Sequence, residues 1–342
     1  MDISKNKYRL KISSLEFTTR INGNAIEDKS FNFTISPQEC YGYETFGTSN
    51  DDGDGHRIWY TNGCITTNSS TKISNVEYPQ INHECFYGSN QPRYFTPDFD
   101  FSRLNSNILL IASSDTRVAS FNNCKVKNDV ICEFDSSGNL IWSFDCAEEL
   151  DKFEFTSDEI RDILNSDNIF PAFSKYLDWI HLNSVCIVGD NSLFDNGDSR
   201  FKPTNLIVTS RNLNMIFIID KETKSIQYKI RISDIVDKYN SCHYGHIIPK
   251  GLKGDGNLLF LAHSTELCKS IVVEYDISNN TIVFSYDAFE TKTMGSVQKL
   301  PDGNYLIGSG ASGEVIVVDP TGVIVSYLKL DEPFYRANYI PE

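Results

Sequence analysis

The feature that most constrains this chain is a strand pattern that occurs four times. Each copy begins with an apolar strand directly after an asparagine, continues with a second apolar strand that ends in aspartate, and closes with a turn and a third strand. The first strands are Asn107–Ile111, Asn205–Val208, Asn257–Phe260 and Asn304–Ile307. The last three asparagines are 52 and 47 residues apart. A period of about 40–50 residues with four strands per unit is typical of propeller blades, so the pattern predicts an all-β fold.

The whole chain, residues 1–342, is predicted to form a single β-propeller domain. Its first part, residues 1–95, follows the repeat poorly, although Tyr8–Phe17, Phe31–Ile35 and Arg57–Tyr60 have the composition of strands. We expect one or two irregular blades there. Together with the four regular copies they predict a six-bladed propeller.

Residues 147–177 interrupt the strand pattern. Leu150, Phe153 and Ile160 recur at a helical spacing, and Thr156 and Asp158 can cap a helix. We therefore expect a helical insertion between two blades. An insertion of this kind usually lies over one face of the disc, where it can cover the channel mouth.

Hairpin geometry predicts a cluster of hydrogen-bond donors at one rim of two neighbouring blades. The residue six positions after the hairpin asparagine should lie beside the start of the preceding strand. The donors brought to this rim are His181, Asn183 and Arg211 in one blade and His243, His246 and His263 in the next. The same count places Ser113 beside the segment Asp98–Asp100 and Gly310 beside the segment Met294–Ser296. Because the first strand of a blade lines the channel, the donors should form a pocket for a small oxyanion.

Composition limits the partners of such a pocket. The formal net charge of −15 argues against a nucleic-acid or anionic-membrane surface. No apolar run is long enough to span a membrane, and the start of the sequence has no apolar run typical of a signal peptide. We therefore expect a cytoplasmic protein that binds neither nucleic acid nor membrane; homo-oligomer formation is left open.

Cysteine and metal-ligand spacing adds two expectations. The nine cysteines are an odd number without a CxxC pair, which favours reduced thiols, with one or two disulfides as the alternative. No spacing is typical of a zinc site, and the sequence predicts neither a metal nor a cofactor.

Several motifs resemble the arylsulfotransferase family, the PAPS-independent aryl-sulfate sulfotransferases. They are Asp178–Val185, Ser210–Leu213, His246–Gly251, Gly256–Asn257, Gln298–Asn304 and Phe334–Pro341. The resemblance runs from about Asp98 to the C-terminus. It implies a six-bladed propeller and transfer of a sulfuryl group from an aryl sulfate donor to a phenolic acceptor through a sulfated histidine.

The resemblance also implies residue roles. His243 corresponds to the nucleophile, and His181, Asn183 and Arg211 correspond to the residues that bind the sulfate and stabilise the transition state. The substrate-binding residues that we predict are His246, His263, Ser296, Asp98, Phe99, Trp179 and Arg336.

Two departures from the family pattern leave alternatives open. Asp98–Asp100 stands where the family has a His-His-Asp motif, so Phe99 replaces a histidine, and Ala262–Ser264, with His263 at its centre, stands where the family has Asp-Asn-Gly. Either His263 replaces the missing histidine or it is a loop residue that faces solvent. The alternatives to a sulfotransferase are a diverged propeller enzyme that acts on an aromatic metabolite by His/Asp acid–base chemistry, and a non-catalytic binding propeller.

Overall fold

The computed structural model describes the chain in several ranges. Backbone strands are described before residue 88, followed by residues 89–90, 92–93, 96, 103, 105, 107–135, 139–166, 176–289, 294–329 and 334–340. Within these ranges the fold is all-β, with mostly antiparallel sheets and few helices. The predicted fold class is confirmed to this extent, while the number of blades stays a prediction.

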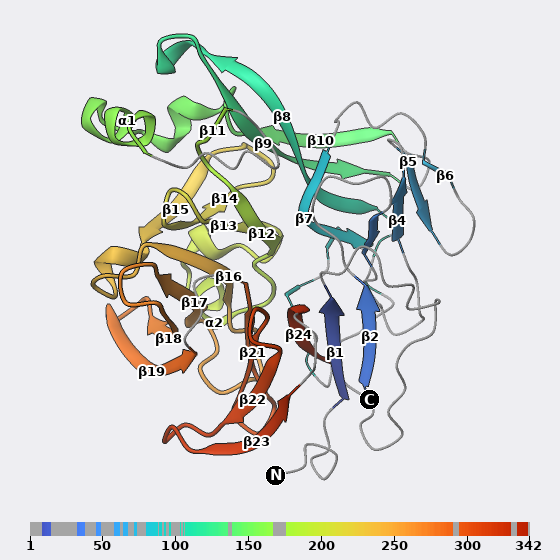
Figure 1. Ribbon diagram of the computed structural model, residues 1–342, viewed down its shortest axis with the longest axis vertical. Helices are drawn as coiled ribbons and strands as arrows, with labels where there is room; N and C mark the ends of the chain where they lie inside the picture. The colour runs from blue at the N-terminus through green and yellow to red at the C-terminus, as the bar shows by residue number, and fades with distance from the viewer. Residues whose placement is uncertain are drawn as a thin grey trace.

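Four-stranded antiparallel sheets succeed one another along the chain (Figure 1). The first is built from β3 (Phe46–Thr48), β4 (Ile58–Thr61), β5 (Cys64–Thr67) and β6 (Lys72–Ile73). The second is built from β7 (Gln80–Tyr87), β8 (Ile108–Val118), β9 (Cys124–Phe134) and β10 (Leu140–Asp145). The two-residue strand β11 (Leu177–Asp178) joins the second sheet by pairing in parallel with β9.

Three further sheets repeat this order. The third contains β12 (Leu182–Ile187), β13 (Leu206–Ser210), β14 (Met215–Ile219) and β15 (Ile226–Arg231). The fourth contains β16 (Ser241–Ile247), β17 (Leu258–Ser264), β18 (Lys269–Asp276) and β19 (Thr281–Phe289). The fifth contains β20 (Ser296–Lys299), β21 (Tyr305–Ser309), β22 (Glu314–Val318) and β23 (Ile324–Lys329). The strands predicted after the four asparagines are thus confirmed.

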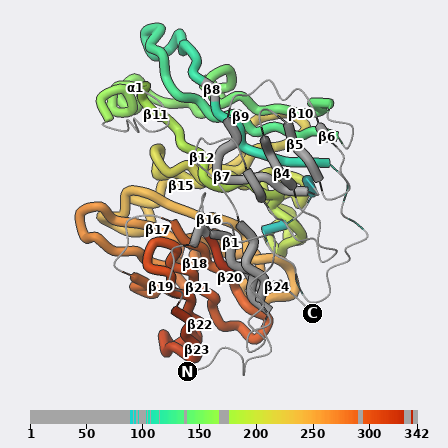
Figure 2. The backbone as a smooth tube through the Cα atoms, turned by 45° about the vertical axis from the view of Figure 1, so that its right-hand side comes forward, coloured from blue at the N-terminus to red at the C-terminus, as the bar shows by residue number. Residues whose placement is uncertain are grey.

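A sixth sheet joins the two ends of the chain. Strand β1 (Arg9–Ser14) pairs in parallel with β2 (Phe33–Pro37) and antiparallel with β24 (Phe334–Ile340). Figure 1 shows β24 beside β1, and Figure 2 shows the later sheets following one another down the molecule.

The hydrophobic core lies between neighbouring sheets. One cluster joins the second and third sheets, for example Ile131 with Phe217, and another joins the third and fourth, for example Ile216 with Phe260. A further cluster joins the fourth and fifth sheets. The inner strands β13, β16 and β17 are therefore buried along their whole length, whereas the outermost strands β19 and β23 are largely exposed.

Two short helices occupy part of the predicted insertion. A 3₁₀ helix spans Leu150–Phe153, and α1 spans Ser157–Leu164. The predicted cap is present, because the Thr156 side chain accepts a hydrogen bond from the Glu159 N–H and the Glu159 carboxylate accepts one from the Thr156 N–H. Residues 167–175 lie outside the described ranges, so the extent of the insertion over 147–177 stays a prediction.

The assignment of the strand before Asn107 was wrong. The expected start at Asp98 is replaced by β7, whose first residue Gln80 pairs with Ser113. The residue six positions after Asn107, Ser113, does lie beside the start of the preceding strand, as predicted. That strand is β7, which lies earlier in the sequence than Asp98. A long connection between β7 and β8, which no periodicity marks, explains the error.

Gly245 permits the close approach of β16 to the third sheet. Its N–H donates to Thr209 Oγ1 at 3.0 Å, and an added Cβ would lie 2.5 Å from Ile216 Cδ1. Such a contact between well-packed elements forces a shift of side chains or backbone.

We therefore expect Gly245→Ala to lower the free energy of unfolding by about 1–3 kcal/mol in urea denaturation, because it overpacks this contact. Ile216→Val removes the nearest methyl group and should recover part of the loss when it is combined with Gly245→Ala. Strictly additive effects of the two substitutions would show that the Gly245–Ile216 contact is not the cause.

Candidate functional site

His181 lies in the short connection between β11 and β12. Its φ is 47°, in the left-handed region that non-glycine residues seldom occupy. The N–H of Arg211 donates to the His181 carbonyl at 2.9 Å, and the hydroxyl of Ser210 donates to the Ile180 carbonyl. The predicted placement of Arg211 beside His181 is thus confirmed for the backbone.

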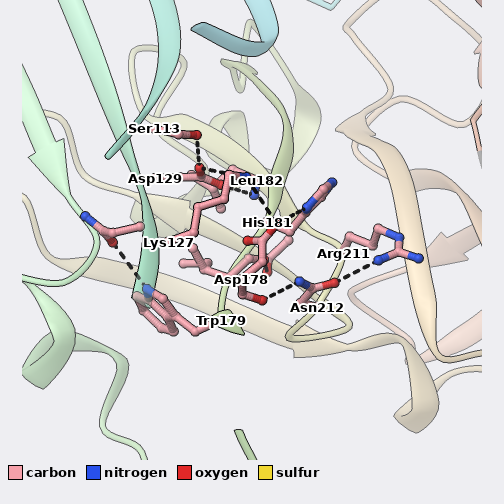
Figure 3. Close-up of polar contacts among 12 residues, drawn as sticks. Ser113, Lys127, Asp129, Asp178, Trp179, His181, Leu182, Arg211 and Asn212 are labelled. Carbon is pink, nitrogen blue, oxygen red and sulfur yellow. Dashed lines mark hydrogen bonds and ion pairs between the residues drawn. The ribbon is translucent and has the colours of Figure 1, made fainter. Parts of the chain in front are cut away.

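A buried carboxylate holds the His181 ring. Asp178 Oδ2 lies 2.6 Å from His181 Nδ1 and 3.1 Å from Lys127 Nζ (Figure 3). Burial acts to raise the pKa of the Asp178 carboxyl, but the charges of His181 and Lys127 outweigh it and lower the pKa to about 2. Asp178 is therefore an ionised acceptor at neutral pH.

Asn183 occupies a bulge in β12. Leu182 pairs with Ser210 and Ser184 with Thr209, so Asn183 is the extra residue. Its side-chain amide donates to the Cys242 carbonyl at 2.7 Å, which links β12 to β16 of the next sheet.

His243 and His263 meet at the corresponding end of the fourth sheet. His263 pairs with Ser241 across β16 and β17, and the His243 and His263 ring centroids are 4.7 Å apart in an edge-to-face arrangement. Both side chains are buried, and His263 Nδ1 lies 2.8 Å from Ser270 Oγ. His263 therefore does not face solvent, and the alternative that made it a solvent-facing loop residue is wrong.

A tyrosine between two arginines follows His243. The Tyr244 ring lies 4.5 Å from the Arg93 guanidinium and 5.0 Å from the Arg336 guanidinium, and all three residues are buried. Arg336 donates to the Asn183 carbonyl at 2.6 Å, and Arg93 donates to the Val185 carbonyl at 3.0 Å. The predicted residue Arg336 therefore reaches the same strand as Asn183.

Three predicted residues have other surroundings. The Trp179 ring packs in the hydrophobic core against Phe121 and Phe153, and its Nε1 donates to Asn128 Oδ1 at 3.3 Å. Ser296 Oγ donates to the Ala337 carbonyl and accepts from the Ala337 N–H, each at 2.8 Å, and so holds β24 in place. The third is His246, described below. Asp98 and Phe99 lie outside the described residues.

Sequence reasoning missed four residues of this region: Lys127, Asp178, Arg93 and Tyr244. Asp178 is the first residue of the motif Asp178–Val185 and precedes His181 by three positions. Lys127 carried no signal, because its place beside Asp178 depends on the parallel pairing of β11 with β9.

A surface cavity of about 300 Å³ lies at the other end of β12. Its lining includes Ile187, the last residue of β12, together with Gly189 and Pro249, whereas His181 comes directly before the first residue of that strand. This cavity is therefore separate from the histidine cluster. Among the described side chains, no group of three or more His, Cys, Asp or Glu residues is placed to hold a metal ion, and no helix in the described part is long and apolar enough to cross a membrane.

His246 is a neutral interior residue. Burial lowers its pKa to about 3, and the charge of Arg93 acts in the same direction. Because the Tyr244 carbonyl can only accept, His246 Nδ1 donates the hydrogen bond of 2.8 Å between them. His246 is consequently uncharged at the pH where a cation would be needed for sulfate binding.

The low pKa of His246 predicts a loss of stability in acid. Below pH 6.5 the unfolded chain binds a proton at His246 that the folded protein does not bind until about pH 3, so the free energy of unfolding falls across this window. In His246→Gln this contribution is absent. Urea denaturation at pH 7 and pH 4 should therefore show a smaller decrease in the variant than in the wild type; an equal decrease would contradict a neutral buried His246.

Three solved structures that are similar to this chain share little sequence with it. A protein of unknown function from Bacteroides caccae shares 13% identity over 60% of this chain and 55% of its own, with a TM-score of 0.36. The Dos1 propeller shares 10% identity over 81% and 56%, with a TM-score of 0.44. A virginiamycin B lyase from Staphylococcus aureus, with Quinupristin, shares 11% identity over 84% and 70%, with a TM-score of 0.42. The chain spans about half the length of the first two.

The sequence comparisons bear on the resemblance in the motifs. No curated protein matches the chain. Residues 93–234, less than half of the chain, match the family described as Arylsulfotransferase (ASST). This segment contains His181, Asn183 and Arg211. Over these residues the match confirms the resemblance to the arylsulfotransferase family that was inferred from the motifs.

Proposed function

We propose that the six sheets are the blades of a six-bladed propeller. Five of them are meanders of four strands in chain order, and adjacent meanders in the described part share hydrophobic clusters. The sixth sheet pairs strands from the two ends of the chain, which is a common way to join the last blade to the first.

We propose further that the protein is an aryl-sulfate:phenol sulfotransferase that acts through a sulfated His243. The observation that carries this proposal is the link between two sheets at one end. Asn183, beside His181 and Arg211, donates to the backbone of Cys242, the residue before His243. The segment that holds the first three residues is the one that matches the family.

The proposed reaction proceeds in two displacements at sulfur. A ring nitrogen of His243 attacks the donor, an N–S bond forms, the S–O bond breaks, and the phenoxide leaves. The acceptor phenol then loses its proton and attacks the same sulfur, and the N–S bond breaks. No cofactor is needed, because the donor itself supplies the activated sulfuryl group.

Positive groups beside Tyr244, the residue after His243, suit this chemistry. Negative charge develops on the three oxygens of the sulfuryl group as it is transferred, and charge-assisted hydrogen bonds stabilise it. Arg211 supplies such donors in the proposal, and Arg336 and Arg93 add positive charge deeper in the molecule. These groups provide the local cationic surroundings that a chain with a net charge of −15 needs to bind an anion.

We expect His243→Ala to abolish release of nitrophenol from 4-nitrophenyl sulfate in the presence of an acceptor phenol, because the nucleophile is lost. In the wild type, mass spectrometry after incubation with donor alone should detect one added sulfuryl group on the peptide that contains His243. Lys250→Met is the control, since Lys250 contacts Asp195 on an exposed surface at the opposite end of the strands. Equal background rates for wild type and His243→Ala with several donors and acceptors would refute the proposal.

His263 replaces the family histidine in this proposal. We expect His263→Phe to lower kcat/KM for the sulfate ester by roughly 10–10³-fold, the range for loss of one hydrogen-bond donor near the reacting group. Phenylalanine keeps the edge contact with His243 but removes both nitrogens. An unchanged midpoint of thermal denaturation would show that the loss of kcat/KM is not caused by misfolding. An unchanged kcat/KM would show that His263 is not part of the site.

The contact of Asp178 with His181 supports a second candidate function, acid–base chemistry on an aromatic metabolite. A buried carboxylate that orients a histidine is the arrangement of a general base. Turnover of an aromatic metabolite without any sulfate ester, lost in His181→Phe but retained in His243→Ala, would favour this candidate over the sulfotransferase.

A further inference from the structure

The β8–β9 hairpin extends beyond the rest of its sheet. Strand β10 pairs with Val130–Phe134 of β9 and leaves the preceding part of that edge open. Strand β11 fills part of this edge in parallel, with Leu177 opposite Val126 and Asp178 opposite Lys127. Because paired residues project to the same face of a sheet, this register puts the carboxylate of Asp178 beside the ammonium group of Lys127.

The neighbouring carboxylate of Asp129 binds other groups. Asp129 Oδ1 accepts from Ser113 Oγ at 2.5 Å, and Asp129 Oδ2 accepts from the Leu182 N–H at 2.6 Å. Lys127 Nζ is 3.9 Å from Asp129 but 3.1 Å from Asp178. Asp129 thus fixes the backbone that follows His181, and Lys127 has its closer contact with Asp178.

The Asp178 contact decides which nitrogen of His181 carries a proton. Asp178 is ionised at neutral pH and can only accept, so the 2.6 Å contact requires a hydrogen on Nδ1. Lys127 remains charged, because Asp129 and Asp178 outweigh the burial that acts to lower its pKa. In the neutral imidazole, Nε2 then bears the lone pair, and in Figure 3 this side of the ring points away from Asp178.

We propose that Asp178, itself anchored by Lys127, is a positioning residue that holds His181 as the Nδ1–H form and so presents Nε2 to the substrate. The left-handed backbone at His181 supports this assignment, because strained residues of this kind are retained where a side chain must be aimed. The catalytic consequence rests on the proposed function: Nε2 takes the proton of the acceptor phenol as its oxygen bonds to sulfur and the bond between sulfur and His243 breaks. The assignment of the proton to Nδ1 does not depend on that function.

Long-range ¹H–¹⁵N NMR of the full-length protein, with ¹⁵N-labelled histidine, tests the proton assignment directly. Spectra are recorded at a pH where the ring carbons show His181 to be neutral. We expect the wild-type His181 signals of the Nδ1–H form. His246 serves as an internal reference, since its Nδ1 donates to the Tyr244 carbonyl. A wild-type His181 with its proton on Nε2 would overturn the proposal without any variant.

Substitutions then assign the effect to Asp178. In Asp178→Asn, whose amide can donate as well as accept, the ratio of Nδ1–H to Nε2–H should fall by about 10-fold or more, because a charge-assisted hydrogen bond is lost. Lys127→Met should keep the Nδ1–H form, since the carboxylate remains. Asp145→Asn is the matched control: Asp145 is a partly buried aspartate that accepts from Asn128 and Ala147. An unchanged ratio in Asp178→Asn would refute the role of Asp178.

Sulfuryl transfer from 4-nitrophenyl sulfate provides the second readout. We expect Asp178→Asn to lower kcat by about 10–100-fold, the range for carboxylates that orient functional histidines in metal sites, with Asp145→Asn unchanged. An altered proton ratio with unchanged kcat would refute the catalytic consequence alone. Absence of transfer in the wild type, together with the expected ratio, would refute the proposed function but leave the proton assignment in place.

Discussion

Strand β12 lies at the edge of its sheet, and side chains from other parts of the described chain satisfy backbone groups on this edge. Buried N–H and C=O groups without partners are costly. On β12 the carbonyls of Asn183 and Val185 accept from Arg336 and Arg93, and the N–H of Leu182 donates to Asp129. The polar side chains of the interior are therefore required by the fold as well as available for chemistry.

Several side chains of the proposed site are fixed in position because they also form hydrogen bonds to the backbone of neighbouring strands. Asn183 links two sheets through Cys242, and Ser296 holds β24 through both backbone groups of Ala337. Groups already fixed by such bonds lose little conformational freedom when a ligand arrives, which is the condition for electrostatic stabilisation of a transition state. The same dependence means that truncating these residues affects stability together with function.

Irregular backbone occurs just before β12, within β16 and just before β20. His181, Tyr244 and Met294 all have φ between 47° and 62°, and β12 and β16 contain register shifts nearby. Bulges re-aim side chains relative to a regular strand. Here the side chains of His181 and Tyr244 do not follow the regular alternation between the two faces of a strand. Counting along a strand therefore located these residues but did not predict their contacts.

The sequence by itself determined the all-β class, the strands after the four asparagines, and the neighbourhoods of His181 with Arg211 and of His243 with His263. These follow from local periodicity and from hairpin register, which depend on residues close in sequence. Only the tertiary structure decided that β7 precedes Asn107 in its sheet, that Trp179 and His246 are interior residues, and that Lys127 meets Asp178. Those outcomes depend on long connections and on packing between sheets, and neither leaves a periodic signal in the chain.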